Sequence, residues 1–189
     1  KMAISIANTG IDVLLVINPH LFYDERGLYK KNYEIDTYNE FGISRNFTES
    51  SDLYSVKGAL RGLHYQTRYS QAKLLHVISG TIYDVAVDLR KGSKTFGKYH
   101  AELMKAEDNK VIFVPEGFAH GFITLSEEAI FSYQCSGKYD PDSCGGILWN
   151  DPGLGIEWPL EEYSIEKVIC TEKDKNWPTF EQYCAMQAD

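Results

Sequence analysis

Short apolar runs separated by glycine and polar turn residues recur along this chain, and they constrain its fold more than any other feature. The runs are too short for typical helices, and the 189-residue chain also carries 13 tyrosines and nine phenylalanines, which favour strands. We predict strands at residues 13–18, 29–33, 45–50, 59–66, 73–79, 81–89, 98–103, 110–114, 120–124, 130–135 and 146–149. Helix is predicted at residues 35–41 and in the tail after Glu172, where Asn176-Trp177-Pro178 interrupts it.

The pair Ser79-Gly80 lies between two of these runs and is typical of a tight hairpin turn. In the run at residues 81–89, apolar residues alternate with Asp84 and Asp88, which places the apolar residues and the aspartates on opposite faces of a strand. Two carboxylates inside an apolar strand are unusual, and we expect Asp84 to support a cationic residue of a neighbouring pocket. Many short strands with frequent turn signals predict a mostly β fold, a jelly-roll sandwich or barrel whose mouth can hold a ligand.

The length and charge of the chain limit its domain organisation and the classes of partner that it can bind. We predict a single domain over residues 1–189, with a core at about 12–158 and an extension at 159–189. A net charge of −8 argues against nucleic acid or an anionic membrane surface as partner. No apolar run could cross a bilayer, and the N-terminal residues lack the order of a signal peptide, so we expect a cytoplasmic protein. The cysteines show no C-x-x-C spacing and are predicted to be free thiols.

Two histidines stand beside turn residues in strand-like sequence, and we expect them to share a pocket. His64 lies in Leu60-Arg-Gly-Leu-His64-Tyr-Gln66, and His120 in Pro115-x-Gly117-x-x-His120, which resembles the second element of cupin barrels. The first cupin element requires H-x-H, but Tyr65 and Gln66 follow His64. A metal site needs three protein donors, so we predict no metal. His76 and His100 are expected to be structural.

Several ordered motifs carry a family resemblance. They are Leu60-Arg-Gly-Leu-His64-Tyr-Gln66, Asp84-Val-Ala-Val-Asp88-Leu-Arg90, Phe118-Ala-His120-Gly-Phe122 and Trp149-Asn-Asp151-Pro152, with Asp24-x-Arg26-Gly27 upstream. Between about Phe22 and Trp158 the chain resembles the dTDP-4-dehydrorhamnose 3,5-epimerase family. The resemblance implies a homodimeric cupin-like jelly roll that needs no metal or redox cofactor. Its substrate would be a nucleotide-linked 4-keto-6-deoxyhexose, inverted at the carbons next to the ketone.

The resemblance also implies catalytic roles, and these agree with the chemistry of the side chains. A proton next to a ketone is a weak acid, so a base must be assisted by stabilisation of the enolate oxygen. His64 matches the base, Tyr133 the acid that returns a proton from the opposite face, and Lys73 the cation facing the enolate. Asp174 is predicted to fix the tautomer of the His64 imidazole.

Substrate recognition is predicted from the same resemblance. Arg61 and Arg26 suit the phosphate oxygens, Phe22 and Tyr139 the nucleoside, and His120 the sugar pocket. Arg26 and Phe22 are expected to reach into the neighbouring site of a dimer. The remaining predicted substrate-binding positions are Lys31, Glu49, Ser51 and Gln66.

Two departures from the family pattern leave the substrate open. The family usually has a glutamine followed by Asp-Asn-His-Ser where this chain has Glu49-Ser50-Ser51-Asp52-Leu53, and a glutamate where it has Lys31. These changes favour keeping, as an alternative, epimerisation of a single carbon or of a sugar on another nucleotide. The alternatives from other classes are a non-catalytic sugar-nucleotide-binding cupin and a metal-dependent cupin enzyme. Trp149-Asn-Asp151-Pro152 is interpreted as a turn that closes the barrel.

Overall fold

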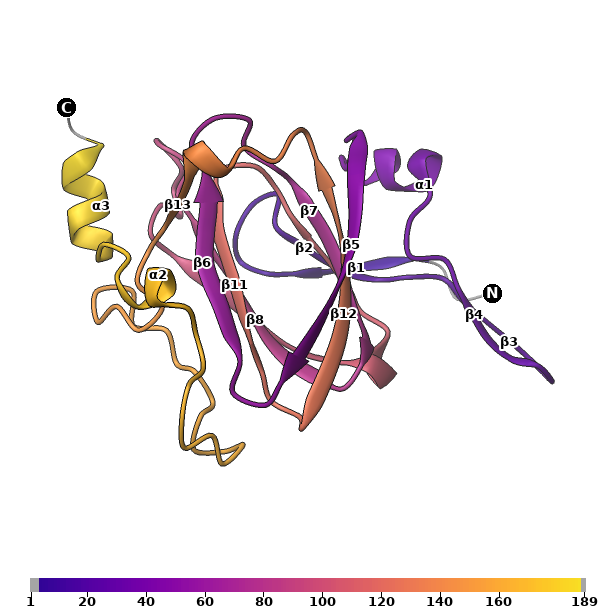
Figure 1. The fold of residues 1–189 in the computed structure, drawn as a ribbon. Helices are drawn as coiled ribbons and strands as arrows, with labels where there is room; N and C mark the ends of the chain where they lie inside the picture. The colour runs from indigo at the N-terminus through magenta and orange to yellow at the C-terminus, as the bar shows by residue number, and fades with distance from the viewer. Residues whose placement is uncertain (1–3, 188–189) are drawn as a thin grey trace.

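The structure, a computed structural model, describes residues 4–187 and consists mainly of two antiparallel sheets that face each other (Figure 1). The six-stranded sheet has, in spatial order, β1 (Ser5–Asn8), β2 (Leu15–Asn18), β10 (Val111–Val114), β7 (Lys73–Ser79), β12 (Glu128–Ser136) and β5 (Phe47–Val56). The five-stranded sheet has β13 (Cys144–Gly146), β6 (Leu60–Gln66), β11 (Phe118–Thr124), β8 (Thr81–Asp88) and β9 (Tyr99–Lys105). The predicted mostly β, jelly-roll architecture is confirmed.

The main core lies between the sheets and follows from the two-residue period of their strands. Leu75 and Phe131 reach it from the six-stranded sheet, and Ile82, Ala86 and Phe122 from the five-stranded sheet. All five are at most 3% exposed. This packing fixes the two sheets against each other and leaves space for a cavity at one end.

Both outer faces of the sandwich are also partly covered. Helix α1 (Ile35–Glu40), predicted at 35–41, packs Tyr38 against the outer face of the six-stranded sheet together with Leu74. The C-terminal tail covers the five-stranded sheet, where Tyr183 packs with Val85 and Val87 (Figure 1, left). Strand β8 is therefore buried on both faces over most of its length.

The tail contains two short helices, α2 (Glu172–Lys175) and α3 (Phe180–Met186), and the predicted interruption at Asn176-Trp177-Pro178 separates them. Two 3₁₀ turns complete the elements, η1 (Ala106–Asp108) and η2 (Pro141–Ser143). None of the helices within residues 4–187 is long and apolar enough to cross a membrane.

The predicted hairpin at Ser79-Gly80 is wrong. Strands β7 and β8 lie in different sheets, so Gly80 forms a corner between them. Its φ is +81°, and a Cβ there would lie 2.2 Å from the carbonyl oxygen of Glu128, so only glycine fits. The alternation in the two runs identified strands, but it carries no information about which strands pair.

Two other strand predictions need correction. In place of a strand at 29–33, β3 (Leu21–Asp24) and β4 (Gly27–Lys30) form a hairpin that projects from the body (Figure 1). The strand predicted at 146–149 is β13, which ends at Gly146, and Trp149-Asn150 lies in a turn. In both places, turn residues next to apolar residues shifted the expected boundaries.

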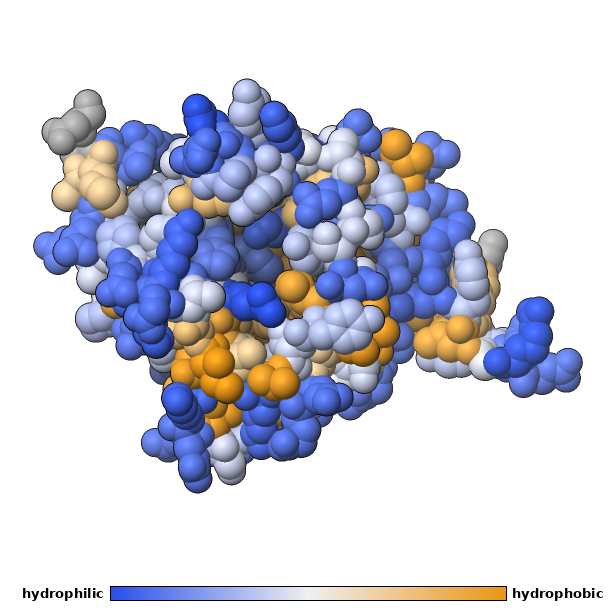
Figure 2. Space-filling model, viewed as in Figure 1, coloured by the Kyte–Doolittle hydropathy of each residue, from blue (hydrophilic) through white to orange (hydrophobic). Residues whose placement is uncertain are grey.

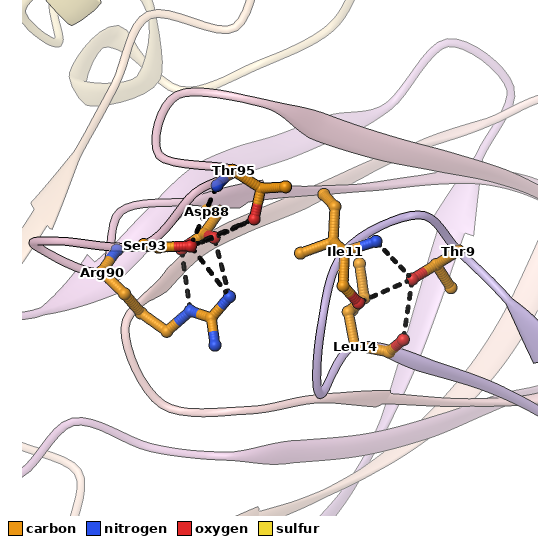
Figure 3. A network of polar contacts seen from close by, with 7 residues as sticks. All are labelled: Thr9, Ile11, Leu14, Asp88, Arg90, Ser93 and Thr95. Atoms are coloured by element: carbon orange, nitrogen blue, oxygen red, sulfur yellow. Dashed lines mark hydrogen bonds and ion pairs between the residues drawn. The ribbon is translucent and has the colours of Figure 1, made fainter.

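Asp88, one of the two unusual carboxylates, ends β8 in a network of hydrogen bonds (Figure 3). Its carboxylate is fully buried and accepts bonds from Arg90 Nε (2.9 Å), Ser93 Oγ (2.6 Å) and Thr95 Oγ1 (2.7 Å). Burial raises the pKa of Asp88, but the hydrogen bonds from Arg90, Ser93 and Thr95 outweigh it and hold this pKa well below its usual range. Asp88 therefore stabilises the loop after β8.

Candidate active site

A cavity of about 580 Å³ opens between the two sheets at one end of the sandwich. Figure 2 shows the hollow in the same view as Figure 1, with hydrophilic residues around its opening. Phe118, Phe122 and Phe131 form its apolar wall. The predicted site residues that line it are Glu49, Arg61, His64, Gln66, Lys73, His120, Tyr133, Tyr139 and Asp174.

His64 lies on β6 and forms a pair with a residue of the tail. Its Nε2 is 2.5 Å from Oδ1 of Asp174, the residue expected to partner it. The Asp174 side chain is 5% exposed, whereas that of His64 is 41% exposed. The imidazole can therefore reach the cavity while its carboxylate partner is buried behind it.

Asp174 is held in place by its own neighbours. Its backbone N–H donates to Thr171 Oγ1 (3.1 Å) at the start of α2, and its Oδ1 accepts from Trp177 Nε1 (3.0 Å). Burial raises the pKa of Asp174, but the hydrogen bonds from His64, Trp177 and Thr171 outweigh it and lower this pKa. An ionised carboxylate can only accept, so His64 Nε2 donates to it, and in the neutral imidazole Nδ1 then carries the free lone pair.

The orientation of Trp177 depends on a glycine. A Cβ at Gly146 on β13 would lie 2.4 Å from the indole ring of Trp177. The indole thus packs directly against the backbone of the edge strand, and this contact supports the hydrogen bond to Asp174.

His120 lies on β11, directly opposite His64 in the strand register. Its Nε2 is 2.8 Å from Oδ2 of Asp84 on the neighbouring strand β8. The two side chains are only 7% and 2% exposed. Asp84, which we expected to support a cationic pocket residue, is thus paired with a histidine inside the sheet.

Tyr133 lies on β12 of the other sheet, opposite Ser51 of β5 in the register. Burial is the main cause that raises the pKa of its phenol, and the thiol of Cys135 and the carboxylate of Glu49 add to the effect, against a hydrogen bond with Ser51. The phenol therefore holds its proton at neutral pH. Ser51 itself does not line the cavity but contacts this phenol.

Lys73 is the first residue of β7 and points into the same cavity. Burial lowers the pKa of its ammonium group, and nearby acidic groups, including Asp84 and Glu49, oppose the shift. Whereas the ammonium group of Lys110 pairs with Glu102, that of Lys73 makes no hydrogen bond or ion pair within residues 4–187. The ammonium group is thus available to a ligand.

Gln66 borders the cavity, but its amide is occupied. Its Nε2 donates to the carbonyl of Tyr69 (2.9 Å), and its Oε1 accepts from the backbone N–H of Asp140 (3.0 Å). These bonds tie together the two loops at the cavity rim. In this structure Gln66 therefore supports the rim, and contact with a substrate through its amide stays a prediction.

The other three predicted residues do not line the cavity of their own chain. Arg26 lies in the turn of the β3–β4 hairpin, 84% exposed and paired with Asp24, and Phe22 on β3 stacks on His20 at 4.4 Å. Lys31 forms an ion pair with Glu34 at 2.7 Å. The β3–β4 hairpin carries Arg26 and Phe22 away from the body (Figure 1), and Lys31 directly follows β4.

Gln71, Lys173 and Trp177 are among the cavity residues that the sequence reasoning missed. Lys173 lies over the indole of Trp177 at 5.0 Å from the ring centre. Apart from Asp174, the tail was interpreted only as a helix with a break, and an aromatic residue at that break was the available signal. Within the described part of the chain, no group of three His, Cys, Asp or Glu residues could hold a metal ion.

The comparisons with known proteins agree with this geometry. A family profile described as dTDP-4-dehydrorhamnose 3,5-epimerase matches residues 8–182. A protein of that name from Methanothermobacter thermautotrophicus is 43% identical over 169 residues, 89% of this chain and 90% of the relative.

Solved structures give the same result. The epimerase from Legionella pneumophila in complex with dTDP-4-keto-L-rhamnose has a TM-score of 0.91 and 39% identity, covering 97% of this chain and 96% of that one. A 3'-monoepimerase from Streptomyces bikiniensis in complex with dTDP-quinovose has a TM-score of 0.85 and 28% identity, covering 94% and 88%. On this match in sequence and in structure, the chain belongs to the dTDP-4-dehydrorhamnose 3,5-epimerase family.

Proposed function

We propose that this protein inverts C3 and C5 of a nucleotide-linked 4-keto-6-deoxyhexose, converting dTDP-4-dehydro-6-deoxy-D-glucose to dTDP-4-dehydro-L-rhamnose. The observation that carries the proposal is that His64 and Tyr133 come from opposite sheets and line one cavity. Inversion requires two such groups, because one must remove a proton from one face of a carbon and the other must return a proton to the opposite face.

The proposed reaction begins at the imidazole. Nδ1 of His64 takes the proton from the carbon next to the ketone, and the electrons of the C–H bond move to the C4 oxygen as an enolate. Lys73, whose ammonium group lines the cavity without a protein partner among the described residues, stabilises that oxygen as its charge develops. Tyr133 then donates its proton to the other face of the carbon, and solvent restores the protonation of both residues.

Arg61 is proposed to bind the diphosphate. It lines the cavity from β6, three residues before His64, and provides a fixed positive charge in a chain whose net charge is −8. Its planar guanidinium group suits phosphate oxygens. Tyr139, 59% exposed at the cavity rim, is proposed to contact the nucleoside.

We propose that the protein is a homodimer whose hairpins cross between subunits. The β3–β4 hairpin exposes Phe22, Tyr23 and Tyr29, an apolar surface that a lone subunit would leave in water. Its tip, which carries Arg26, is hydrophilic (Figure 2, right). A second subunit would cover the apolar part and receive the arginine near its cavity.

The dimer is tested by mixing two inactive variants. Arg26→Ala and His64→Asn should each be inactive alone, and a mixture unfolded and refolded together should regain part of the wild-type rate. Only a hybrid dimer can combine an intact His64 in one subunit with an intact Arg26 from the other. A mixture as inactive as its parents would contradict the shared site, and light scattering would report the oligomeric state independently.

Deuterium incorporation from D₂O, followed by NMR with dTDP-4-dehydro-6-deoxy-D-glucose, tests the reaction itself. Label at both C3 and C5 is expected. Label at one carbon would favour the single-carbon alternative, for which the monoepimerase relative and the replacements Lys31 and Glu49 are the motivation. No label, together with binding of dTDP in a thermal-shift assay, would favour the non-catalytic alternative.

We also propose a cytoplasmic location. All four cysteines, Cys135, Cys144, Cys170 and Cys184, are free thiols, as is usual in a reducing compartment. Fractionation of the native host with a cytoplasmic marker tests this proposal.

A further inference from the structure

Gln71 lines the cavity two residues before Lys73, and the mechanism above gives it no role. Between them, Ala72 is fully buried and packs with Leu74 on the outer face of the six-stranded sheet. In an extended chain, residues two apart point to the same side. Gln71 and Lys73 therefore point into the cavity together, while Ala72 points away from it.

The backbone at this point is held firmly. The N–H of Ala72 donates to Ser136 Oγ (2.9 Å), and its carbonyl accepts from the N–H of Ser136 (2.9 Å) at the end of β12. These two bonds extend the pairing of β7 with β12 past Lys73. The direction of the flanking Gln71 side chain is fixed as a result.

The amide of Gln71 has a buried donor without an acceptor. Its Nε2 is shielded from solvent and makes no hydrogen bond to the described residues. An unpaired buried donor is unfavourable, and most native proteins avoid it. Gln66, the other glutamine at this cavity, has its Nε2 bonded to backbone carbonyls. The contrast indicates that the acceptor for Gln71 is supplied by a ligand.

We propose that Gln71 contacts the substrate, donating a hydrogen bond to the C4 oxygen of the sugar alongside Lys73. This inference rests on the proposed function. Consecutive strand residues rise by about 3.3 Å, so the two side chains start about 6.6 Å apart, and both are long enough to converge on one oxygen. Lys73 supplies the charge, and Gln71 supplies a fixed direction that the flexible ammonium group lacks. Together they form an oxyanion-binding pair.

The test compares three variants with the wild type. Gln71→Leu removes the donor but keeps similar bulk, and Gln71→Glu replaces it with acceptors. Gln134→Leu is the matched control, because Gln134 follows Tyr133 on β12, points to the other face and does not line the cavity. For each protein, kcat and deuterium exchange are measured with dTDP-4-dehydro-6-deoxy-D-glucose, and Tm is measured with and without dTDP.

We expect Gln71→Leu to lower kcat about 10²-fold, as for loss of one oxyanion donor, and Gln71→Glu to lower it at least as much. The Tm of free Gln71→Leu should equal or exceed that of the wild type, because an unpaired buried donor has been removed. The shift in Tm caused by dTDP, and the kcat of Gln134→Leu, should be unchanged.

Three results would overturn the inference. The first is a wild-type kcat in Gln71→Leu. The second is a lower kcat in Gln71→Leu together with a lower Tm of this variant without ligand. The third is full activity in Gln71→Glu, which would make residue 71 an acceptor. If the wild type itself causes no exchange, the proposed function fails and the inference falls with it. An active wild type with an unaffected Gln71→Leu overturns the inference alone.

Discussion

Two histidine–carboxylate pairs stand side by side in the cavity, and they differ in where their carboxylates come from. His64 and His120 face each other across β6 and β11. Asp84 reaches His120 from the next strand of the same sheet, whereas Asp174 reaches His64 from 110 residues further along the chain. The His120 pair is almost completely buried, and the His64 imidazole is 41% exposed.

A histidine and a carboxylate can therefore serve two purposes in one cavity. A base must reach the substrate and exchange its proton with solvent, so it needs an exposed imidazole on a buried, fixed carboxylate. A buried histidine bonded within the sheet is instead a rigid wall of the pocket. We therefore propose that His64 transfers the proton and that His120 shapes the pocket.

Substitution of the His64 imidazole is expected to change kcat more than any other substitution, and that of the His120 imidazole by a very different amount. His64→Asn should lower kcat about 10³-fold, since general bases contribute about 10²- to 10⁴-fold. His120→Asn should lower kcat much less, because it alters the wall and leaves the base intact. Initial rates of deuterium exchange measure both. Equal losses of kcat would contradict different roles for the two imidazoles.

For stability the order is expected to be reversed: loss of Asp84, the partner of His120, should lower the free energy of unfolding more than loss of Asp174, the partner of His64. Asp84→Ala leaves a buried histidine without its partner and should lower the free energy of unfolding by about 3 kcal/mol. Asp174→Ala leaves an imidazole that can turn to water and should cost about 1 kcal/mol. Urea denaturation at pH 7 checks this, and a larger loss for Asp174→Ala would contradict it.

We propose that Asp174 is a positioning residue, so its removal should change the tautomer of the imidazole as well as the rate. Asp174→Asn should lower kcat about 10²-fold, within the range for a general base that has lost its orientation. In the wild type, ¹⁵N NMR of neutral His64 should show Nε2 protonated, and in the variant a mixture of tautomers. An unchanged tautomer with a lowered kcat would assign Asp174 another role.

A third histidine, without a carboxylate partner, gives an effect that builds up gradually with pH. Burial, helped by the charge of Lys30, lowers the pKa of His76 to about 4, and its Nε2 lies 3.0 Å from Asn32 Nδ2. The unfolded chain, with an ordinary pKa near 6.5, then binds more protons than the folded one.

Stability should therefore be complete above about pH 6.5 and fall as the pH drops towards 4, by up to about 1.4 kcal/mol per pH unit. Urea denaturation between pH 7 and pH 4 measures the slope, and His76→Gln should flatten it. The same slope in the wild type and in His76→Gln would assign the acid sensitivity to other groups.

The motifs around the two histidines could be predicted because they are local. The helix at 35–41 and most strands follow from apolar periodicity, and the resemblance of the ordered motifs identified the family. Pairing of strands could not be predicted, since the alternation around Gly80 fits a hairpin and a corner equally well. Gln71 was missed because its signal, a buried donor without an acceptor, exists only in three dimensions.

The contact between Trp177 and Gly146 makes the placement of Asp174, the partner of the proposed base, depend on a residue without a side chain. A single methyl group there would push the indole outward, and the displaced indole would release the carboxylate that aligns the base. Anyone who redesigns this enzyme for a new sugar should leave this edge glycine untouched, although it does not line the cavity.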